Sequence, residues 1–396
     1  MHKLFFLILL IFIGTITEAQ IRKDTLVKKK EIKRPVVHVG GKMEPDSTLI
    51  EVAQPLFKIG GALRFNYFVK DWVDANKKKG GDFNYDMFRL NVVGEFRRLL
   101  LSAEYRFYSK AFGGGMLKNG WMGYAISPQD EIQLGLHQVP FGNQVYNSDN
   151  WFFNITYYLG LEDDYDVGVK FIHAGMKIRY VLAYYKNSEY PPGNYSRYSY
   201  DVVGINEETN QFNAKISYLL PGTRLSFSAQ CGQLYNHLSG DFGRHDAYAL
   251  HLRSDFKRWT LKLQALTFIM HPANPDSITD KTISMGAYNA AYQVATAGEV
   301  YTLSLAYHVP VNWGAVSRLK FYNNYSYFDK SDNAFHDSQM NVLGCLLTAG
   351  KIYTYIDWAA GLNHPWLGPD YSTSLAEGTE DAPWHYRFNI NFGYYF

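Results

Sequence analysis

A two-residue alternation of apolar and polar side chains, which continues from Leu56 to Phe396, constrains the fold of this chain more than any other feature. In the segment FKIGGALRFNYFV, which starts at Phe57, the odd-numbered positions are mostly apolar and the even-numbered positions include Lys58 and Arg64. Because successive side chains of a β-strand point to opposite faces, this pattern predicts strands with one apolar and one polar face. Aromatic residues, which favour strands, make up 17% of the sequence. We therefore expect an all-β protein.

The breaks between the alternating segments are of two kinds, and the two kinds alternate along the chain. The short breaks lie near residues 97–99, 127–130, 173–175, 220–223, 257–259 and 349–351. The long breaks span residues 70–82, 111–117, 140–164, 188–204, 236–243, 270–298, 329–336 and 362–384. Short turns at one rim and long loops at the other are typical of outer-membrane β-barrels.

A soluble β-sandwich also shows alternation, so segment length has to distinguish the two fold classes. Most segments here have roughly ten to fifteen residues, whereas globular strands average about five to six. A tilted strand needs about nine to eleven residues to cross a bilayer. Aromatic residues near segment ends, such as Tyr200 and Trp259, match the aromatic girdles of membrane barrels. The sequence thus predicts a transmembrane antiparallel β-barrel.

The number of strands follows from the up-and-down order of the segments. A direct count gives seventeen segments. An odd number of strands would place the start of the first strand and the end of the last strand at opposite rims of the barrel. The order is regular from Leu56 to Met270 and again backwards from Phe396, so the conflict lies between residues 271 and 310. If residues 271–298 form a structured outer loop, sixteen strands remain. We predict sixteen strands, with eighteen as the alternative.

The amino-terminal segment has the features of a secretory signal peptide. Lys3 precedes an apolar run from Leu4 to Ile13, and Thr17 and Ala19 occupy positions −3 and −1 of a cleavage site. The run of about ten residues is too short to cross a bilayer core of about 30 Å as a helix. The expected segments are a signal peptide at 1–19, a flexible periplasmic lead-in at 20–55 and an outer-membrane barrel at 56–396.

The last residues of the chain, WHYRFNINFGYYF, carry an unbroken row of apolar and aromatic side chains at alternate positions. The row consists of Phe388, Ile390, Phe392, Tyr394 and Phe396. This stretch resembles the carboxy-terminal strand of bacterial outer-membrane barrels, which ends on an aromatic residue. The resemblance implies that the row is an assembly signal for the barrel insertion machinery. We also expect this strand to pair with the first strand and close the sheet.

A second resemblance is to one porin family. The stretch GLHQVPFGNQVYNSDN is similar to the strand-to-loop corner of the phosphate-selective porins (O and P), where a strand ends in Pro-Phe-Gly before a loop that folds into the channel. The stretches YQVATAGEVYTLSLAYHVP and FYNNYSYFDK also resemble that family. The resemblance covers residues 56–396. It implies that residues 140–164, which start with Pro140, Phe141 and Gly142, form an inward-folding constriction loop.

If the apolar face of each strand points outward, the polar face lines the lumen and is rich in basic residues. We predict a pore-lining role for Arg64, Arg89, Arg106, Lys110, Lys170, Lys177, Arg179, Lys215, Arg253, Lys262, Arg318 and Lys320. Basic rings in a narrow aqueous pore favour anions over cations, because the low-dielectric wall focuses their field. The alternative is that these charges pair with lumen acids or are simply hydrated, and the sequence leaves both open.

An acidic cluster, Glu162, Asp163 and Asp164, closes the inward-folding loop. If these acids face the basic wall, they create a transverse field of mixed sign at the constriction and weaken the preference for anions. Carboxylates at this density also suit a hard cation such as calcium, but the spacing of a calcium-binding loop is absent. We therefore expect a solvated loop base and no bound metal.

The expected function is that of a porin: a water-filled channel for passive diffusion of small hydrophilic solutes, with a preference for phosphate or other anions. The alternatives are a non-conducting adhesin or structural barrel and, less favoured, an outer-membrane lipid hydrolase. The sequence contains no G-x-S-x-G, H-E-x-x-H or G-x-x-x-x-G-K motif, and we expect neither an enzyme nor a cofactor.

The partners that we expect are outer-membrane lipid, the barrel insertion machinery and small anionic or polar solutes. The family resemblance implies a homotrimer. A net charge of +2 argues against a nucleic-acid partner, because nothing in the chain provides a basic surface of the size that phosphate backbones attract.

Overall fold

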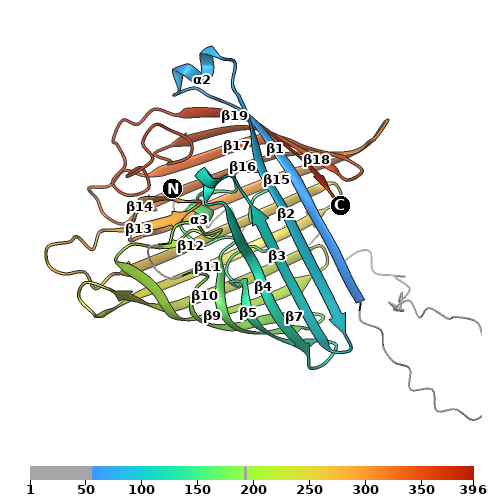
Figure 1. The fold of residues 1–396 in the computed structure, drawn as a ribbon, viewed down its shortest axis with the longest axis horizontal. Helices are drawn as coiled ribbons and strands as arrows, with labels where there is room; N and C mark the ends of the chain where they lie inside the picture. Colours follow the sequence, from blue (N-terminus) through green and yellow to red (C-terminus); the bar gives the residue numbers. More distant parts are fainter. Residues whose placement is uncertain (1–55, 191–193) are drawn as a thin grey trace, which may run out of the picture. The chain divides into compact units, whose positions relative to one another are not determined.

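The computed structural model describes residues 56–190 and 194–396, which form a closed antiparallel barrel (Figure 1). The wall strands are β1 (Leu56–Lys70), β2 (Asp82–Phe96), β3 (Leu99–Phe107), β4 (Gly115–Ala125), β5 (Asp130–Gln138), β6 (Tyr165–Ala174), β7 (Ile178–Ser188), β9 (Asn206–Leu220), β10 (Thr223–Asn236), β11 (Phe242–Phe256), β12 (Trp259–His271), β15 (Ala297–Trp313), β16 (Val316–Lys330), β17 (Ser338–Ala349), β18 (Ile352–Leu362) and β19 (His385–Tyr395). The predicted fold with sixteen strands is confirmed, and the alternative of eighteen is wrong. The predicted signal peptide at 1–19 and lead-in at 20–55 lie outside the described residues.

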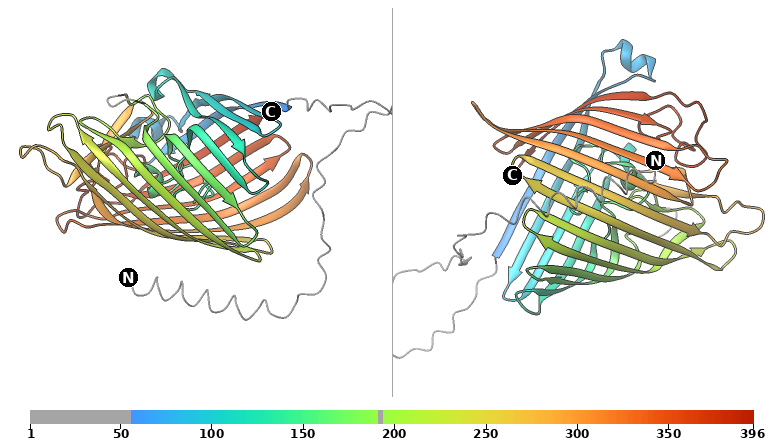
Figure 2. Two further views of the ribbon diagram at one scale, coloured as in Figure 1. Left: turned by 90° about the horizontal axis from the view of Figure 1, so that it is seen from below. Right: turned by 180° about the vertical axis from the view of Figure 1, so that it is seen from behind.

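Short turns join the strands at one rim, and long loops join them at the other (Figures 1 and 2). The loop between β12 and β15 contains β13 (Thr282–Ala287) and β14 (Ala290–Ala295). Together with β8 (Asp201–Val202), these two strands form a separate three-stranded sheet. The prediction that residues 271–298 form a structured loop is therefore confirmed, and the alternation inside it belongs to a small sheet that is not part of the barrel wall.

The helices of the described residues are short. They are α2 (Asp74–Lys78) between β1 and β2, η1 (Lys110–Phe112) between β3 and β4, and α3 (Ile155–Tyr158) between β5 and β6. Within residues 56–190 and 194–396, no helix has both the length and the apolar character needed to cross a membrane.

The barrel has an apolar outer face and a polar inner face, the reverse of a soluble protein. On the outer face, Ile59 is 76% exposed and Leu343 is 60% exposed. On the inner face, Asn389, Asn391 and Asp357 are buried. This distribution is the one required of a barrel that hydrocarbon surrounds, because each strand alternates between lipid-facing and lumen-facing residues.

The predicted aromatic row of β19 lies on the outer face. Its last three members, Phe392, Tyr394 and Phe396, are exposed, whereas the intervening Asn389 and Asn391 are buried in the lumen. The strand pairs with β1 from Ala62 opposite Tyr395 to Lys70 opposite Arg387. The prediction that the last strand closes the sheet is confirmed.

Phe396 extends the seam at which the last strand, β19, pairs with the first strand, β1. Its N–H donates to the carbonyl oxygen of Gly61 (3.1 Å), and the N–H of Gly61 donates to the carbonyl oxygen of Phe396 (3.0 Å). A Cβ atom on Gly61 would lie 2.5 Å from the ring of Phe396, so the close approach of the ring requires glycine. The ring also stacks on Phe88 of β2 at 6.5 Å between centroids. Phe396 therefore contacts the first two strands of the barrel, β1 and β2.

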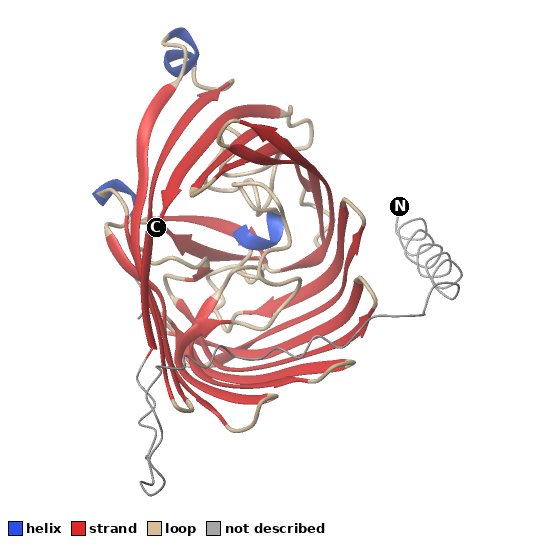
Figure 3. Ribbon diagram, turned by 90° about the vertical axis from the view of Figure 1, so that its right-hand side faces the viewer, coloured by secondary structure: helices blue, strands red, loops and turns tan. Residues whose placement is uncertain are grey.

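An apolar core fills the part of the lumen beneath the long loops. Ile155 and Leu161, from the loop between β5 and β6, pack in one cluster with Val202 of β8, Met285 of β13 and Val294 of β14. Figure 3 shows α3 inside the ring of strands. The small sheet and the inward loop therefore support each other, which gives the loop a fixed position in the lumen.

Candidate functional site

The loop between β5 and β6, residues 139–164, turns into the lumen directly after β5. Its corner consists of Pro140, Phe141 and Gly142, which are all buried. Gly142 has a φ of 60°, and a Cβ atom there would lie 2.6 Å from Oε1 of Gln264 on β12. The carbonyl oxygen of Gly142 accepts a hydrogen bond of 2.6 Å from Nζ of Lys215 on β9. The corner is therefore clamped against two wall strands, and a side chain at position 142 would disrupt it.

Beyond the corner, the loop follows the inner wall and forms hydrogen bonds with one strand after another. These bonds join Asn143 N–H to Gln264 Oε1 (2.9 Å), Asn147 Nδ2 to Thr302 Oγ1 (2.7 Å), Asn150 Nδ2 to Asn324 Oδ1 (2.7 Å), Trp151 N–H to Asp357 Oδ2 (3.1 Å) and Ile155 N–H to Ser326 Oγ (3.2 Å). The acceptors lie on β12, β15, β16 and β18. The loop thus occupies the lumen and narrows it.

Asp149 is the charged anchor of this loop. Its carboxylate lies 3.1 Å from Nζ of Lys262 and 3.0 Å from Nζ of Lys320, and it accepts a hydrogen bond of 2.6 Å from the hydroxyl of Ser304. Burial by itself would raise the pKa of Asp149, but Lys262 and Lys320 outweigh burial and hold the pKa well below its usual range. Asp149 is therefore charged at neutral pH and neutralises part of the basic wall.

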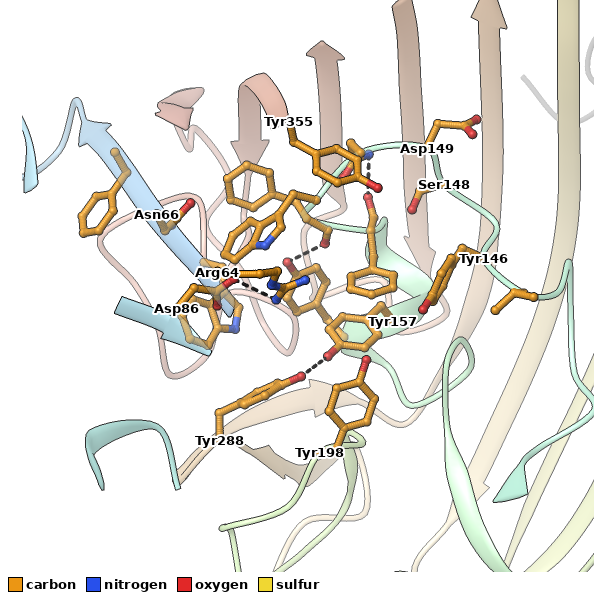
Figure 4. Close-up of a pocket in the computed structure, with 18 of the residues that line it drawn as sticks. Arg64, Asn66, Asp86, Tyr146, Ser148, Asp149, Tyr157, Tyr198, Tyr288 and Tyr355 are labelled. Carbon is orange, nitrogen blue, oxygen red and sulfur yellow. Dashed lines mark hydrogen bonds and ion pairs between the residues drawn. The ribbon is translucent and has the colours of Figure 1, made fainter. Parts of the chain in front are cut away.

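A cavity of about 660 Å³ lies beside the loop in the lumen (Figure 4). Its charged lining residues are Arg64, Lys70, Arg89, Arg106, Arg253, Lys262, Lys320, Arg387, Asp86 and Asp149. Tyr157, Tyr198 and Tyr288 add aromatic rings with polar hydroxyl groups, and the hydroxyls of Tyr157 and Tyr288 are joined at 2.7 Å. The lining thus contains more basic than acidic side chains.

The basic side chains that line the cavity pair with a smaller number of carboxylates. Asp86 pairs with Arg64 at 2.8 Å. Glu104 forms ion pairs with both Arg89 (3.2 Å) and Arg106 (2.7 Å). The sequence left open whether the basic residues are free or paired. In the structure the six that line the cavity form ion pairs, namely Arg64, Arg89, Arg106, Arg253, Lys262 and Lys320, and because they share few acids the lining keeps more basic than acidic groups.

Arg387 contributes to this surplus from β19. Its guanidinium lies over the rings of Phe68 (4.6 Å), Phe152 (5.1 Å) and Trp151 (5.6 Å), and it donates to Oδ1 of Asn389 (3.0 Å). None of the ion pairs in the described part of the chain involves Arg387. Aromatic faces therefore hold the group in place without cancelling its charge.

The structure places the predicted pore-lining residues in three groups. The first group lines the cavity and consists of Arg64, Arg89, Arg106, Arg253, Lys262 and Lys320. The second group supports the loop: Lys215 clamps Gly142, and Lys170 donates to the carbonyl oxygen of Gln138 at 3.0 Å, just before the loop begins.

The third group lies away from the cavity, and two of its members correct the prediction. Lys110 is exposed on η1, because β3 ends at Phe107, and Lys177 is exposed in the turn between β6 and β7. Neither lysine lies on a wall strand, so extending the alternation past the strand ends was wrong. Arg179 and Arg318 lie on wall strands but are exposed next to the short-turn rim.

The acids at the end of the loop, Glu162, Asp163 and Asp164, are all buried, and none of them lines the cavity. Glu162 accepts hydrogen bonds from the N–H of Asn147 (2.8 Å) and the hydroxyl of Thr156 (2.7 Å), and burial raises its pKa to about 7. The expectation of a solvated loop base is therefore wrong. The mixed-sign arrangement predicted for these acids arises from Asp149 instead.

Lys118 of β4 is an inward cation that the alternation did not reveal. The register between β3 and β4 shifts there, because Glu104 lies opposite Asn119 whereas Tyr105 lies opposite Leu117. Lys118 is thus the extra residue of a β-bulge, which changes the face to which a side chain points. Its Nζ lies 3.2 Å from the carboxylate of Asp163, and both side chains are buried.

Replacing Asp163 with asparagine should destabilise the barrel by about 3–5 kcal/mol, because it leaves the buried charge of Lys118 without its counter-ion. Urea-induced unfolding of the protein in lipid vesicles measures the change. A double variant, Asp163→Asn with Lys118→Met, should recover most of the loss, since it removes both charges. Equal destabilisation of the single and double variants would contradict this account of the pair.

A closed antiparallel barrel with an apolar outer face and a polar lumen narrowed by a loop defines the class of transmembrane porin-like barrels. No protein-family model and no curated protein sequence matches the chain. Solved structures do match it. They include an anion-selective porin from Comamonas acidovorans (13% identity, TM-score 0.58, 87% of this chain and 100% of that one). They also include the outer-membrane channel DcaP of Acinetobacter baumannii (10% identity, TM-score 0.56, 87% and 98%).

The trimer form of OmpT, an outer-membrane protein of Vibrio cholerae, is similar to the same degree (12% identity, TM-score 0.56, 86% of this chain and 99% of that one). At this level of identity the likeness establishes the fold. The chain therefore shares the closed sixteen-stranded barrel architecture of these outer-membrane proteins.

Proposed function

We propose that this protein is an outer-membrane porin through which small hydrophilic solutes diffuse passively, with a preference for anions. The observation that carries the proposal is the lumen cavity of about 660 Å³, whose lining contains more basic than acidic side chains. Guanidinium groups present planar pairs of donors that match phosphate and carboxylate oxygens. Phosphate-like anions are accordingly among the proposed solutes, in line with the family resemblance around Pro140, Phe141 and Gly142.

The proposal gives each part of the site a role. Arg64, Arg89 and Arg106 form one basic side of the passage, and Lys262 and Lys320 form the other. The loop at 139–164 sets the width of the constriction. The outward row at the end of β19 is proposed as the signal for the insertion machinery, and the apolar outer face contacts lipid or the neighbouring subunits of a homotrimer.

Flux through liposomes tests the passage itself. Purified protein in liposomes should allow rapid swelling with glucose and faster swelling with small anionic sugars such as gluconate, because the positive lining raises the local anion concentration. Liposomes with heat-unfolded protein serve as the control. The absence of solute flux would leave a non-conducting adhesin or structural barrel as the better interpretation.

Replacing Arg89 with glutamine should lower the anion-to-cation permeability ratio by about twofold, because one cavity charge is lost while Arg106 still neutralises Glu104. Reversal potentials in a salt gradient measure the ratio. The matched control is Lys78→Gln on α2, which removes an exposed charge outside the barrel (Figure 1). An unchanged ratio in Arg89→Gln, or an equal fall in the control, would contradict the proposed role of the lining.

A hydrolase is not the function that we propose, although one serine–histidine pair is present in the barrel. The hydroxyl of Ser228 lies 3.0 Å from Nε2 of His251, and Nδ1 of His251 lies 3.3 Å from Oδ1 of Asn143. Ser228 is 0% exposed, and it is buried beneath the constriction loop. A lipid ester on the outer face of the barrel has no route to this hydroxyl.

A further inference from the structure

A group of buried carboxylates lies where the constriction loop returns to the barrel wall. Asp164 is the last residue of the loop, Asp166 is the second residue of β6, and Asp201 begins β8 in the outer loop that follows β7. One oxygen from each of these three carboxylates lies within 4.8 Å of the others. Their exposures are 7%, 2% and 1%. Three segments that are distant in the sequence thus bring their acids together.

The positive charge around this group is too small to neutralise it. Arg197 donates to Asp201 at 2.9 Å, and the amide of Gln211 donates to Oδ2 of Asp166 at 3.2 Å. Glu189 adds a fourth carboxylate, whose Oε2 is buried and whose Oε1 accepts the N–H of Ser199 at 3.0 Å. Four carboxylates therefore surround one guanidinium, which leaves a surplus of negative charge in a buried place.

Several carboxylate oxygens of the group have no hydrogen-bond donor. Oδ1 of Asp166 is buried and lacks a partner among the described residues, and Oδ1 of Asp201 and Oε2 of Glu189 are likewise buried without a donor, although these two carboxyl groups lie within hydrogen-bond reach of each other. A buried polar atom without a partner costs free energy, and a charged one costs more. These oxygens are therefore available to a ligand that supplies positive charge and takes only oxygen donors.

The closeness of these acids creates an electrostatic conflict. Asp164, Asp166 and Asp201 are buried, and one oxygen of each lies within 4.8 Å of the others, so their ionised carboxylates repel one another. A cation at the centre would relieve this repulsion.

We propose that Asp164, Asp166 and Asp201 bind one divalent cation, and that this cation is Ca²⁺. Calcium takes oxygen ligands at about 2.3–2.6 Å in a flexible geometry, so ligands on opposite sides of the ion are separated by about 4.6–5.2 Å. The three oxygens lie within 4.8 Å of one another, close enough to share one such ion. Magnesium requires a smaller shell at about 2.0–2.1 Å with nearly ideal octahedral geometry.

The ion would fasten the constriction loop to the outer loops. Asp164 and Asp166 flank Tyr165, whose N–H donates to the hydroxyl of Ser199 at 2.9 Å, so the two loops already touch at this point. Asp201 belongs to β8, which pairs with β13 in the small sheet above the lumen. Bound calcium therefore joins three segments, and its removal should loosen the base of the constriction loop.

Calcium binding by the folded, full-length protein in detergent tests this inference after treatment with a chelator. Isothermal titration with CaCl₂ should show one site per chain. Terbium(III), a calcium mimic, should give luminescence sensitised by tyrosine, because Tyr165 lies between two of the ligands. Replacing Asp201 or Asp166 with asparagine should weaken calcium binding on the order of tenfold or more. Circular dichroism establishes that each variant is folded.

The matched control is Asp246→Asn on β11, which removes another buried carboxylate, one that pairs with Arg244 and belongs neither to the constriction loop nor to the cavity lining. It should bind calcium as the wild type does. Absence of calcium binding by the wild type, tighter binding of magnesium than of calcium, or unchanged affinity in both site variants would each overturn the inference. None of these measurements depends on conduction, so failure of this site is distinguishable from failure of the proposed porin function.

Discussion

Replacing Asp149 with asparagine should increase the anion selectivity of the channel and make its current noisier. The carboxylate holds Lys262 and Lys320 together at the constriction, so its loss frees two positive charges and weakens the anchor of the loop. One additional net charge at the constriction should raise the anion-to-cation permeability ratio by about two- to fivefold, which corresponds to about 0.4–1 kcal/mol. This is the largest selectivity change that we expect from a single residue.

The pH dependence of this anchor follows from the low pKa of Asp149. A carboxylate whose pKa is depressed in the folded state contributes stability above its unfolded value of about 4, and the contribution is lost as the pH falls through the folded value. Asp149 should therefore stay ionised and keep its ion pairs throughout the neutral range. Its titration should cause no change in wild-type ion selectivity between about pH 5 and 8.

Single-channel recordings and reversal potentials measure both effects of Asp149→Asn. The matched control is Asp241→Asn, which removes an exposed carboxylate from the loop between β10 and β11. A variant with wild-type selectivity and wild-type noise would show that Asp149 does not hold the constriction.

Deleting Phe396 should reduce insertion of the barrel far more than it alters the channel that does assemble. The deletion removes two backbone hydrogen bonds to Gly61, worth about 1 kcal/mol each, and the contact of the ring with Phe88. The ring of Phe396 is 47% exposed, so its contacts add less than the roughly 1.5–3 kcal/mol of a fully buried aromatic side chain. The loss falls on the seam between β19 and β1, which has to form for the sheet to close.

The fraction of heat-modifiable, folded protein in isolated outer membranes measures insertion. Phe396→Tyr keeps the ring and the backbone bonds and should insert normally, and Phe242→Ala removes an exposed aromatic side chain from the start of β11, well away from the seam. Normal yield of the deletion variant, or an equal loss in Phe242→Ala, would contradict the role of the terminal residue.

Local periodicity was sufficient to predict the wall of the barrel but not the residues that shape its lumen. Alternation is a property of each strand, so the outward row of β19 and the inward Arg64 and Arg89 could be assigned from sequence alone. Bulges reverse that assignment without a clear sequence signal. Asp86, the partner of Arg64, is such a case, because Arg64 lies opposite Met87 whereas Phe65 lies opposite Tyr85.

The contacts of the constriction loop were beyond prediction for a different reason. Asp149 and Lys262 are 113 residues apart, and nothing in the local pattern of either indicates the other. The burial of Glu162, Asp163 and Asp164 likewise depends on β4 and on the outer loop with β8, which the tertiary fold brings together. The resemblance around Pro140 identified the loop, but only the fold shows which wall residues hold it.

The central claim, that this barrel conducts small hydrophilic solutes with a preference for anions, is tested most directly by planar-bilayer recording of the purified full-length protein. We predict stepwise increases in conductance and, in a salt gradient, a reversal potential shifted toward the equilibrium potential of the anion. A folded protein that produces no conductance steps would contradict the porin function. Steps with a shift toward the cation would contradict the proposed role of the basic lining.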